Sequence, residues 1–171
     1  MKRLILLRHA KTEPWYEGGD DHGRALTEHG QDDADLMAQT LVDRGWRPDL
    51  ALVSTARRAR ETWLRAREAM ARSDVRYEDD LYLADPDTLM NVLESARDLS
   101  TVMVIAHNPG LHDFATKLAR TGPTPNQAAF ASLIEKMPTC AAALFEADED
   151  GPVYVSAFRL VDFIRPKSLG L

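Results

Sequence analysis

Short apolar runs alternate with amphipathic segments along most of this 171-residue chain. Each run has the length of a buried strand and stops at polar residues. Such strands are expected at 3–7, 50–53, 75–83 and 101–106. Between the runs, apolar residues recur at intervals of three and four, as on one face of a helix. Helices are therefore expected at about 27–44, 56–71, 86–96, 111–120 and 127–135.

Capping residues mark the ends of two of these helices. Thr27 is placed as the N-cap of the first helix, and Gly45 suits the residue just after its end. Pro48 prevents a restart of that helix. Asp85 is placed to cap a helix that has Pro86 at its first position, where proline is favoured.

Two further strands are expected at 139–147 and 153–160, on either side of the acidic turn 148–152, as an antiparallel hairpin. The alternation of strands and helices before them predicts a mostly parallel sheet covered by helices on both faces. The predicted fold class is thus three-layer α/β/α with an antiparallel edge. No linker or repeat interrupts the pattern, so residues 1–171 are expected to form one domain.

Charge and composition exclude several classes of protein. The formal net charge of −6 argues against a nucleic-acid binder that neutralises phosphates, although a local basic pocket remains compatible with it. No stretch approaches the roughly 20 apolar residues of a membrane span, and the first apolar run is too short for a signal peptide. We therefore expect a cytoplasmic location with no membrane or nucleic-acid partner. Cys140 is the single cysteine and is expected to be a small buried hydrophobe.

Cationic and imidazole side chains follow three of the expected strands. Arg8 and His9 come at the end of the first, Arg58 shortly after the second, and His107 directly after the run 101–106. The carboxyl ends of parallel strands lie at one edge of a sheet, so these four side chains are expected to converge. Each one alone has a structural explanation, and their joint occurrence is what indicates a site. His22, His29 and His112 are expected to be mostly surface residues.

Two guanidinium groups and two imidazoles at one place repel each other unless an anion lies among them. Phosphate is the natural anion, because the planar fork of arginine matches its oxygens. A neutral imidazole, with an ordinary pKa near ~6.5, can also act as a nucleophile. No Asp, Glu or His group has clear metal-ligand spacing, and no Walker-type loop is present, so neither a metal nor a cofactor is expected.

Four segments of the chain, taken in order, resemble those of the histidine phosphatase superfamily, also called the phosphoglycerate-mutase-like family. The sequence 7–10, Leu-Arg-His-Ala, is similar to its nucleophile motif, which is usually Arg-His-Gly. Residues 54–62 resemble the second element and select Arg58 over Arg57 as the phosphate ligand, and residues 106–109 resemble the second-histidine segment. The stretch 24–30 is similar to the Arg-x-Leu-Thr-x-x-Gly of the short SixA-type phosphohistidine phosphatases. The resemblance covers nearly the whole chain.

This resemblance implies a mechanism and a site. His9 would attack phosphorus and become a phosphohistidine, while Arg8, Arg58 and His107 would hold the phosphoryl oxygens; water would then release phosphate, with no metal required. Asn108 and Arg24 are expected to bind substrate. For Arg24 the alternative is a surface residue that pairs with a carboxylate of its own loop, such as Asp20 or Asp21.

Larger members of the superfamily carry a general-acid glutamate after the third strand, where this chain reads Leu-Tyr-Leu-Ala-Asp at 81–85. General-acid help is worth ~10²–10⁴ in rate, and an alkoxide leaving group needs it. An imidazole is a better leaving group, so a site without that acid suits phosphohistidine. Glu13, Asp20 and Asp21 could reach the site from the first loop, but the sequence singles out none of them.

The favoured interpretation is therefore a phosphatase that acts on phosphohistidine in a partner protein. One alternative is a broad-specificity phosphomonoesterase with small phosphorylated substrates. Another is a phosphate-binding module without turnover, although His9 is present. A mutase fits poorly, because few residues beyond the loop 11–23 are available to build a lid. The sequence does not indicate an oligomeric state.

Overall fold

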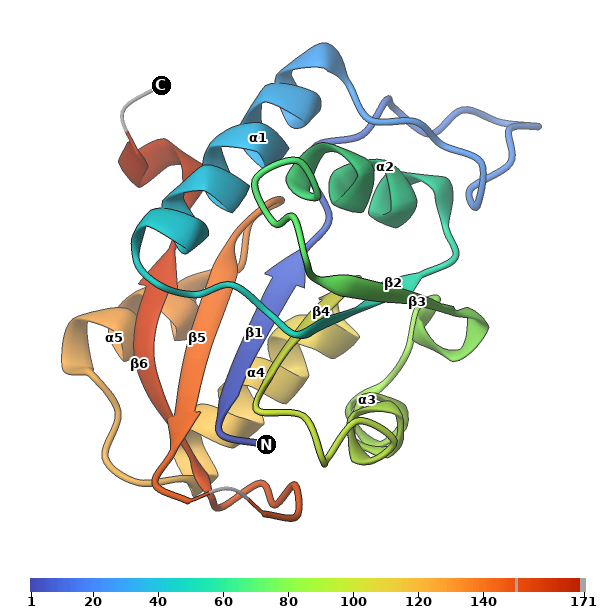
Figure 1. Cartoon of the computed structure of the whole chain (residues 1–171). Coiled ribbons are helices and arrows are strands. Elements are labelled where there is room, and N and C mark those ends of the chain that lie inside the picture. Colours follow the sequence, from blue (N-terminus) through green and yellow to red (C-terminus); the bar gives the residue numbers. More distant parts are fainter. Residues whose placement is uncertain (150, 170–171) are drawn as a thin grey trace.

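A six-stranded sheet lies at the centre of the computed structural model, which describes residues 1–149 and 151–169 (Figure 1). The strands are β1 (Arg3–Arg8), β2 (Leu50–Ser54), β3 (Asp74–Glu78), β4 (Thr101–Ala106), β5 (Ala142–Ala147) and β6 (Phe158–Ile164). The α-helices are α1 (Glu28–Asp43), α2 (Arg57–Ala66), α3 (Pro86–Glu94), α4 (Gly110–Thr121) and α5 (Gln127–Glu135). Two short 3₁₀ helices, η1 (Asp79–Leu81) and η2 (Pro166–Leu169), complete the described elements.

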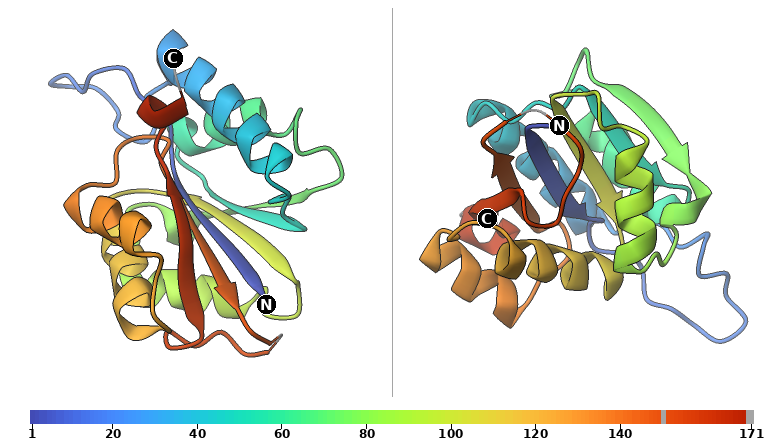
Figure 2. Two further views of the ribbon diagram at one scale, coloured as in Figure 1. Left: turned by 90° about the vertical axis from the view of Figure 1, so that its left-hand side faces the viewer. Right: turned by 90° about the horizontal axis from the view of Figure 1, so that it is seen from below.

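The strand order is β3-β2-β4-β1-β5-β6. Strands β3, β2, β4 and β1 run parallel to one another, whereas β5 is antiparallel to both β1 and β6. Helices α1 and α2 cover one face of the sheet, and α3, α4 and α5 cover the other (Figures 1 and 2). The predicted three-layer α/β/α class with a mostly parallel sheet and an antiparallel edge is therefore confirmed.

Alternation along the central strands divides the core in two. In β1, Leu4 and Leu6 pack on the side of α3, α4 and α5, while Ile5 and Leu7 pack on the side of α1 and α2. All four are almost completely buried. Successive strand residues point to opposite faces, so a strand covered on both sides needs a continuous apolar run. This is why the sequence shows unbroken runs rather than alternation at β1, β2 and β4.

Two glycines allow backbone segments near the ends of β1 and η1 to approach helix starts. A Cβ atom at Gly30, in the first turn of α1, would lie 2.2 Å from the carbonyl oxygen of Lys11. One at Gly110, the first residue of α4, would lie 1.7 Å from the carbonyl oxygen of Ala84. No side chain fits at either place, so both helix starts depend on glycine for this close packing. Thr27 caps α1 through the N–H of Gly30, as predicted.

Several predicted boundaries were wrong. The strand expected at 139–147 begins only at Ala142, and the last strand runs on to Ile164 instead of stopping at residue 160. The strand expected at 75–83 stops at Glu78, where its partner β2 also ends, and Leu81 is buried in η1 instead. The helix expected to reach residue 71 ends at Ala66 and is followed by turns. The last strand begins at Phe158 rather than at residue 153, because 154–157 form a turn in which the Ala157 N–H donates to the carbonyl oxygen of Tyr154 at 3.1 Å.

Other expectations hold for the described residues. Asp85 caps α3 through the N–H of Thr88, and Cys140 is buried. Asp150, part of the predicted acidic turn, lies outside the described residues. Within 1–149 and 151–169, no helix has the length and apolar character that crossing a membrane requires.

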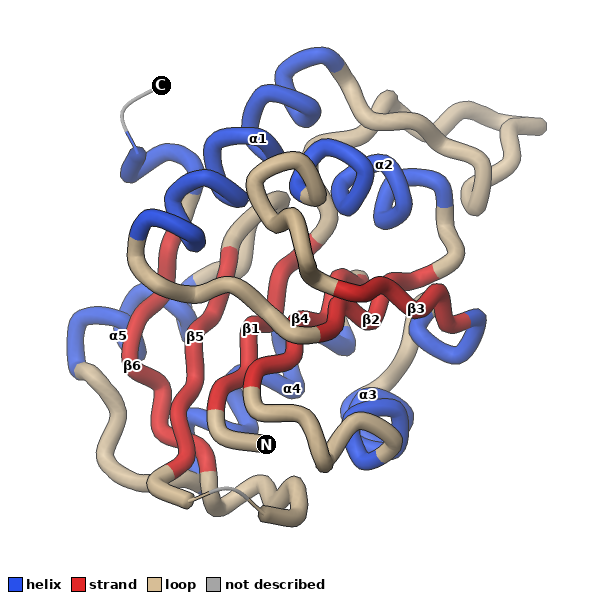
Figure 3. The backbone as a smooth tube through the Cα atoms, in the orientation of Figure 1, coloured by secondary structure: helices blue, strands red, loops and turns tan. Residues whose placement is uncertain are grey.

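A long loop separates β1 from α1 and starts at the carboxyl end of β1 (Figure 3). Its two ends are joined by an isolated antiparallel bridge between Thr12 and Leu26. The rest of the loop projects beyond the helices (Figures 1 and 3). This loop supplies part of the site described next.

Candidate active site

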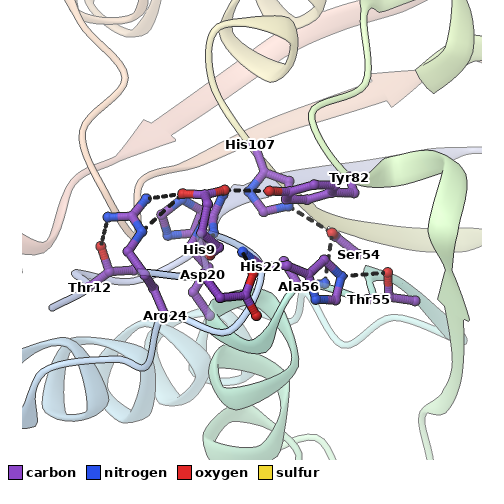
Figure 4. A network of polar contacts seen from close by, with 12 residues as sticks. His9, Thr12, Asp20, His22, Arg24, Ser54, Thr55, Ala56, Tyr82 and His107 are labelled. Atoms are coloured by element: carbon purple, nitrogen blue, oxygen red, sulfur yellow. Dashed lines mark hydrogen bonds and ion pairs between the residues drawn. The ribbon is translucent and has the colours of Figure 1, made fainter. Parts of the chain in front are cut away.

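The two histidines predicted to meet do so at the carboxyl edge of the sheet (Figure 4). His9 follows Arg8, the last residue of β1, and His107 follows Ala106, the last residue of β4; Arg8 and Ala106 are paired in the parallel ladder. The imidazole ring centroids are 5.2 Å apart. Adjacent parallel strands that end at the same level therefore bring together two side chains separated by nearly 100 positions in the chain.

The His9 ring is fixed by its neighbours. Its Nδ1 lies 2.8 Å from the carbonyl oxygen of Ala10, which can only accept, so Nδ1 carries the hydrogen and Nε2 keeps its lone pair. The Ala10 N–H donates to Oγ1 of Thr62 at 3.0 Å, and this hydroxyl donates to the carbonyl oxygen of Arg58. The end of β1 is thus tied to α2, the helix that carries Arg58.

Burial keeps His9 and His107 neutral. It lowers the pKa of each imidazole to about 3, and nearby guanidinium groups act in the same direction. For His9 the hydrogen bond to Ala10 opposes this effect without cancelling it. A neutral imidazole with a free Nε2 is the form that can attack phosphorus.

His107 is held by the hydroxyl of Ser54, the last residue of β2. The His107 Nε2 to Ser54 Oγ distance is 2.7 Å, and this oxygen accepts the N–H of Ala56 at 3.3 Å. The Ser54 hydroxyl can donate its own hydrogen to Nε2, and in that tautomer the His107 hydrogen is on Nδ1. Nδ1 has no hydrogen-bond partner among the described residues.

Two arginines lie beside the histidines. Arg58 is 2% exposed, whereas Arg57 is exposed and pairs with Glu61, so the choice of Arg58 as the inward arginine agrees with the structure. Arg8 donates from a terminal nitrogen to the carbonyl oxygen of Met137 at 3.2 Å. The Nε atoms of Arg8 and Arg58 are both buried and have no partner among the described residues. Unpaired buried donors of this kind are suited to an anion.

Asn108 also reaches Met137. Its Nδ2 donates to the same carbonyl oxygen at 2.9 Å, so the structure brings Asn108 to Arg8. The Oδ1 atom is buried without a partner among the described residues. Its role in substrate binding stays a prediction.

The mouth of the site is built from the loop between β1 and α1. Arg24 donates from Nε to Oδ1 of Asp21 at 3.0 Å and from a terminal nitrogen to Thr12 (Figure 4). Arg58 donates to both the carbonyl oxygen of Asp21, at 2.9 Å, and its Oδ2, at 3.3 Å. Arg24 therefore pairs with a carboxylate of its own loop, as one of the two alternatives has it. Its role in substrate binding stays a prediction.

Sequence reasoning missed Tyr82 and His22 in this network, and it named Asp21 only as one of three loop carboxylates that could reach the site. The Tyr82 hydroxyl donates to Oδ2 of Asp21, and its ring lies 5.5 Å from that of His107 and 4.9 Å from that of His22. His22, expected at the surface, contacts this ring and Oγ1 of Thr55 (Figure 4). For Tyr82 a signal existed, because it stands in the very segment 81–85 noted for lacking a glutamate. Asp21 had no signal that separated it from Asp20.

The arrangement brings together side chains suited to bind an anion and a neutral imidazole of the kind that can act as a nucleophile. Two guanidinium groups, an imidazole N–H and a free imidazole lone pair meet there, while a carboxylate and a phenol stand at the mouth. Among residues 1–149 and 151–169, no three His, Cys, Asp or Glu side chains lie together as a metal site.

Comparison with known proteins agrees with this geometry. The sequence model of the histidine phosphatase superfamily (branch 1) matches residues 4–83. An uncharacterized protein of Mycobacterium leprae is 33% identical over 144 residues, covering 81% of this chain and 85% of that protein. A crystal structure from Agrobacterium tumefaciens, which bears the name of the phosphohistidine phosphatase SixA, is 30% identical with a TM-score of 0.80 and covers 96% of this chain and 99% of that one. The chain belongs to the histidine phosphatase superfamily.

Within this superfamily the chain is SixA-like, as the segment 24–30 predicted. An uncharacterized chloroplastic protein of Arabidopsis thaliana is 36% identical over 159 residues; these are 85% of this chain but only 66% of that relative. Superfamily membership and the SixA-like neighbours support a phosphatase activity. The individual roles of the site residues stay predictions.

Proposed function

We propose that this histidine phosphatase removes phosphate from phosphohistidine, in a partner protein or a small molecule, through a phosphohistidine intermediate on His9. The observation that carries the proposal is the state of His9: a buried, neutral imidazole whose Nδ1 hydrogen is bound to the Ala10 carbonyl oxygen, with its ring 5.2 Å from His107. Arg8 and Arg58 have buried Nε donors in the same place.

In the first step, Nε2 of His9 attacks phosphorus as the bond to the leaving group breaks. Charge on the three equatorial oxygens is stabilised by Arg8, Arg58 and the Nδ1–H of His107. Phosphoryl transfer requires mainly positioning and charge stabilisation, and these donors provide both in a site largely shielded from water. The step places the phosphoryl group on His9 and leaves the departing group free.

In the second step, water attacks phosphorus of phospho-His9 from the side that the leaving group has vacated. The P–N bond breaks, its electrons return to Nε2, and inorganic phosphate is released. Splitting the reaction in this way replaces one difficult displacement by two easier ones. In both steps the positive charge comes from arginine side chains, so the proposal requires no metal.

Phosphohistidine is the substrate class that the site suits best. The segment that carries a glutamate acid in larger relatives provides Tyr82 here, and this phenol is hydrogen-bonded to Asp21. Burial and that hydrogen bond raise the pKa of Tyr82, which makes it a weak proton donor. An imidazole leaving group does not depend on such a donor.

The test is a substrate panel of a phosphohistidine peptide, phosphoserine, phosphotyrosine and sugar phosphates, run in the presence of EDTA. The phosphohistidine peptide should give the highest kcat/KM, and brief incubation with it should leave acid-labile phosphate on His9. His9→Ala should fold and bind phosphate but show neither turnover nor labelling. Higher rates on the alkyl esters would favour the small-molecule phosphomonoesterase, and absence of labelling and turnover would favour a binding module.

A further inference from the structure

The candidate active site has a closed floor and an open mouth. His9 and His107 are 5% and 2% exposed, whereas the side chain of Asp21 is 35% exposed. Asp21 nevertheless contacts the floor, because Arg58 donates to its Oδ2 at 3.3 Å. Its carboxylate therefore lies between the anion-binding floor and solvent.

The direction of attack decides which part of the substrate meets this carboxylate. In an in-line displacement the leaving group departs opposite the nucleophile. His9 attacks from the buried floor, so the leaving group lies toward the mouth, on the side of Asp21. Arg58 uses its two terminal nitrogens on Asp21, and its unpartnered Nε remains for a phosphoryl oxygen. Asp21 can thus stay in place while the phosphoryl group binds below it.

Asp21 is held as an acceptor. It receives hydrogen bonds from Tyr82, Arg24 and Arg58. The Tyr82 bond is the largest cause that lowers the pKa of this carboxyl group, and both arginines add to the effect. An ionised carboxylate accepts a hydrogen bond from a leaving group that carries N–H, but it cannot donate a proton to an alkoxide.

We propose that Asp21 is a specificity-determining residue that selects phosphoramidates with a protonated nitrogen leaving group over phosphate esters. The proposal rests on the proposed function, in which His9 is the nucleophile. Nε2 of His9 forms a bond to phosphorus, and the P–N bond of the substrate breaks with its electron pair going to the substrate nitrogen. The other ring nitrogen keeps its proton, and this N–H donates a hydrogen bond to Asp21. A protonated phosphoimidazole therefore departs as neutral imidazole, and no proton has to be supplied.

An ester faces the opposite situation. Its departing oxygen would develop negative charge beside a carboxylate, and the Tyr82 hydroxyl already donates its hydrogen to Asp21. The same carboxylate thus favours one leaving group and disfavours the other. Such a two-sided effect is how a single polar residue produces selectivity.

The test compares Asp21→Asn with Asp20→Asn, the same chemical change one position earlier. The two substrates are phosphoimidazole and p-nitrophenyl phosphate, whose leaving group needs no proton. Asp21→Asn should lower the ratio of kcat/KM for phosphoimidazole to that for p-nitrophenyl phosphate by roughly tenfold or more, the worth of a charge-assisted hydrogen bond. Asp20→Asn should leave the ratio unchanged. Asp21→Glu, which keeps a carboxylate, should retain a higher ratio than Asp21→Asn.

Two results would overturn this role. An equal loss on both substrates, with weaker inhibition by inorganic phosphate, would mean that Asp21 only positions Arg24 and Arg58. An unchanged ratio would mean that it does not meet the leaving group. Failure of the proposed function is distinguishable, since the unmodified protein would then neither hydrolyse phosphoimidazole nor form phospho-His9.

Discussion

The Nε2 atom of His107 lies 2.7 Å from Oγ of Ser54, and both residues are buried at the ends of neighbouring parallel strands. Through this contact a serine that never needs to touch substrate sets which nitrogen of the histidine carries the hydrogen. The tautomer with Nδ1–H is the one that can donate to a phosphoryl oxygen. Ser54 is therefore expected to act as a positioning residue.

Ser54→Ala should lower kcat by roughly tenfold, because His107 loses the hydrogen bond that fixes its tautomer and ring orientation. The free energy of unfolding should fall by about 1 kcal/mol. Steady-state kinetics and urea unfolding measure the two effects. Thr55→Ala removes the adjacent hydroxyl, which contacts His22 instead, and serves as the control. Equal effects of the two variants on kcat would contradict the assignment.

Acid should destabilise the folded protein through its buried histidines. The unfolded chain binds protons at His9 and His107 near pH 6.5, whereas the folded chain does so only near pH 3, with the pKa of both lowered to about 3. Between these values unfolding takes up protons, so the free energy of unfolding falls as the pH falls. Each histidine should contribute a slope of about 1.4 kcal/mol per pH unit.

Urea unfolding between pH 7.5 and 4.5, in buffers without phosphate or sulfate, checks this slope. His9→Ala should be less sensitive to acid than the unmodified protein, because one of the two groups is gone. The same slope in both proteins would refute the role of burial.

Replacing the buried arginine should be far more costly than replacing its neighbour. Arg58→Lys keeps one positive charge but removes the planar fork, so kcat/KM should fall on the order of 10²-fold. Arg57→Lys should change it little, since Arg57 is exposed and pairs with Glu61. Inhibition by vanadate measures the same difference in the absence of turnover. Comparable losses in both variants would contradict the choice of Arg58.

Gly110→Ala should destabilise the fold, because its Cβ would lie 1.7 Å from the carbonyl oxygen of Ala84. Forcing the start of α4 away from this segment should cost about 1–3 kcal/mol. The displaced segment contains Tyr82, so activity should also fall. Gly151→Ala, where a Cβ meets nothing within 4 Å, is the control in thermal unfolding. Similar melting temperatures for both variants would speak against the close approach.

The buried part of the site could be predicted from the sequence, because most of its residues stand at the ends of strands. Arg8, His9 and His107 follow directly from apolar runs, and the parallel order of the strands brings such ends to one edge of the sheet. Arg58 needed the resemblance to separate it from Arg57, since a helix start alone does not say which residue turns inward. The structure separates the two by burial.

The mouth could not be predicted in the same way. Asp21 and Tyr82 come from irregular segments, 61 positions apart, whose paths depend on tertiary contacts rather than on periodicity. The predicted start of β6 was wrong for a related reason, because 154–157 form a turn that the apolar pattern conceals. Hydrophobic periodicity predicts strands and helices, because each has a regular spacing of buried residues. Loops have no such spacing, so periodicity does not predict their paths.

The division between sheet and loop has a consequence for relatives of this protein. Arg8, His9 and His107, to which the proposed mechanism gives the nucleophile and two of the anion donors, are fixed by the packing of the central strands, where most replacements would damage the core. Asp21 and Arg24 instead belong to a surface loop joined at its base by the bridge between Thr12 and Leu26. Insertions or substitutions in that loop could change which phosphorylated compounds the enzyme accepts. The residues at the strand ends, and the chemistry they perform, would stay the same.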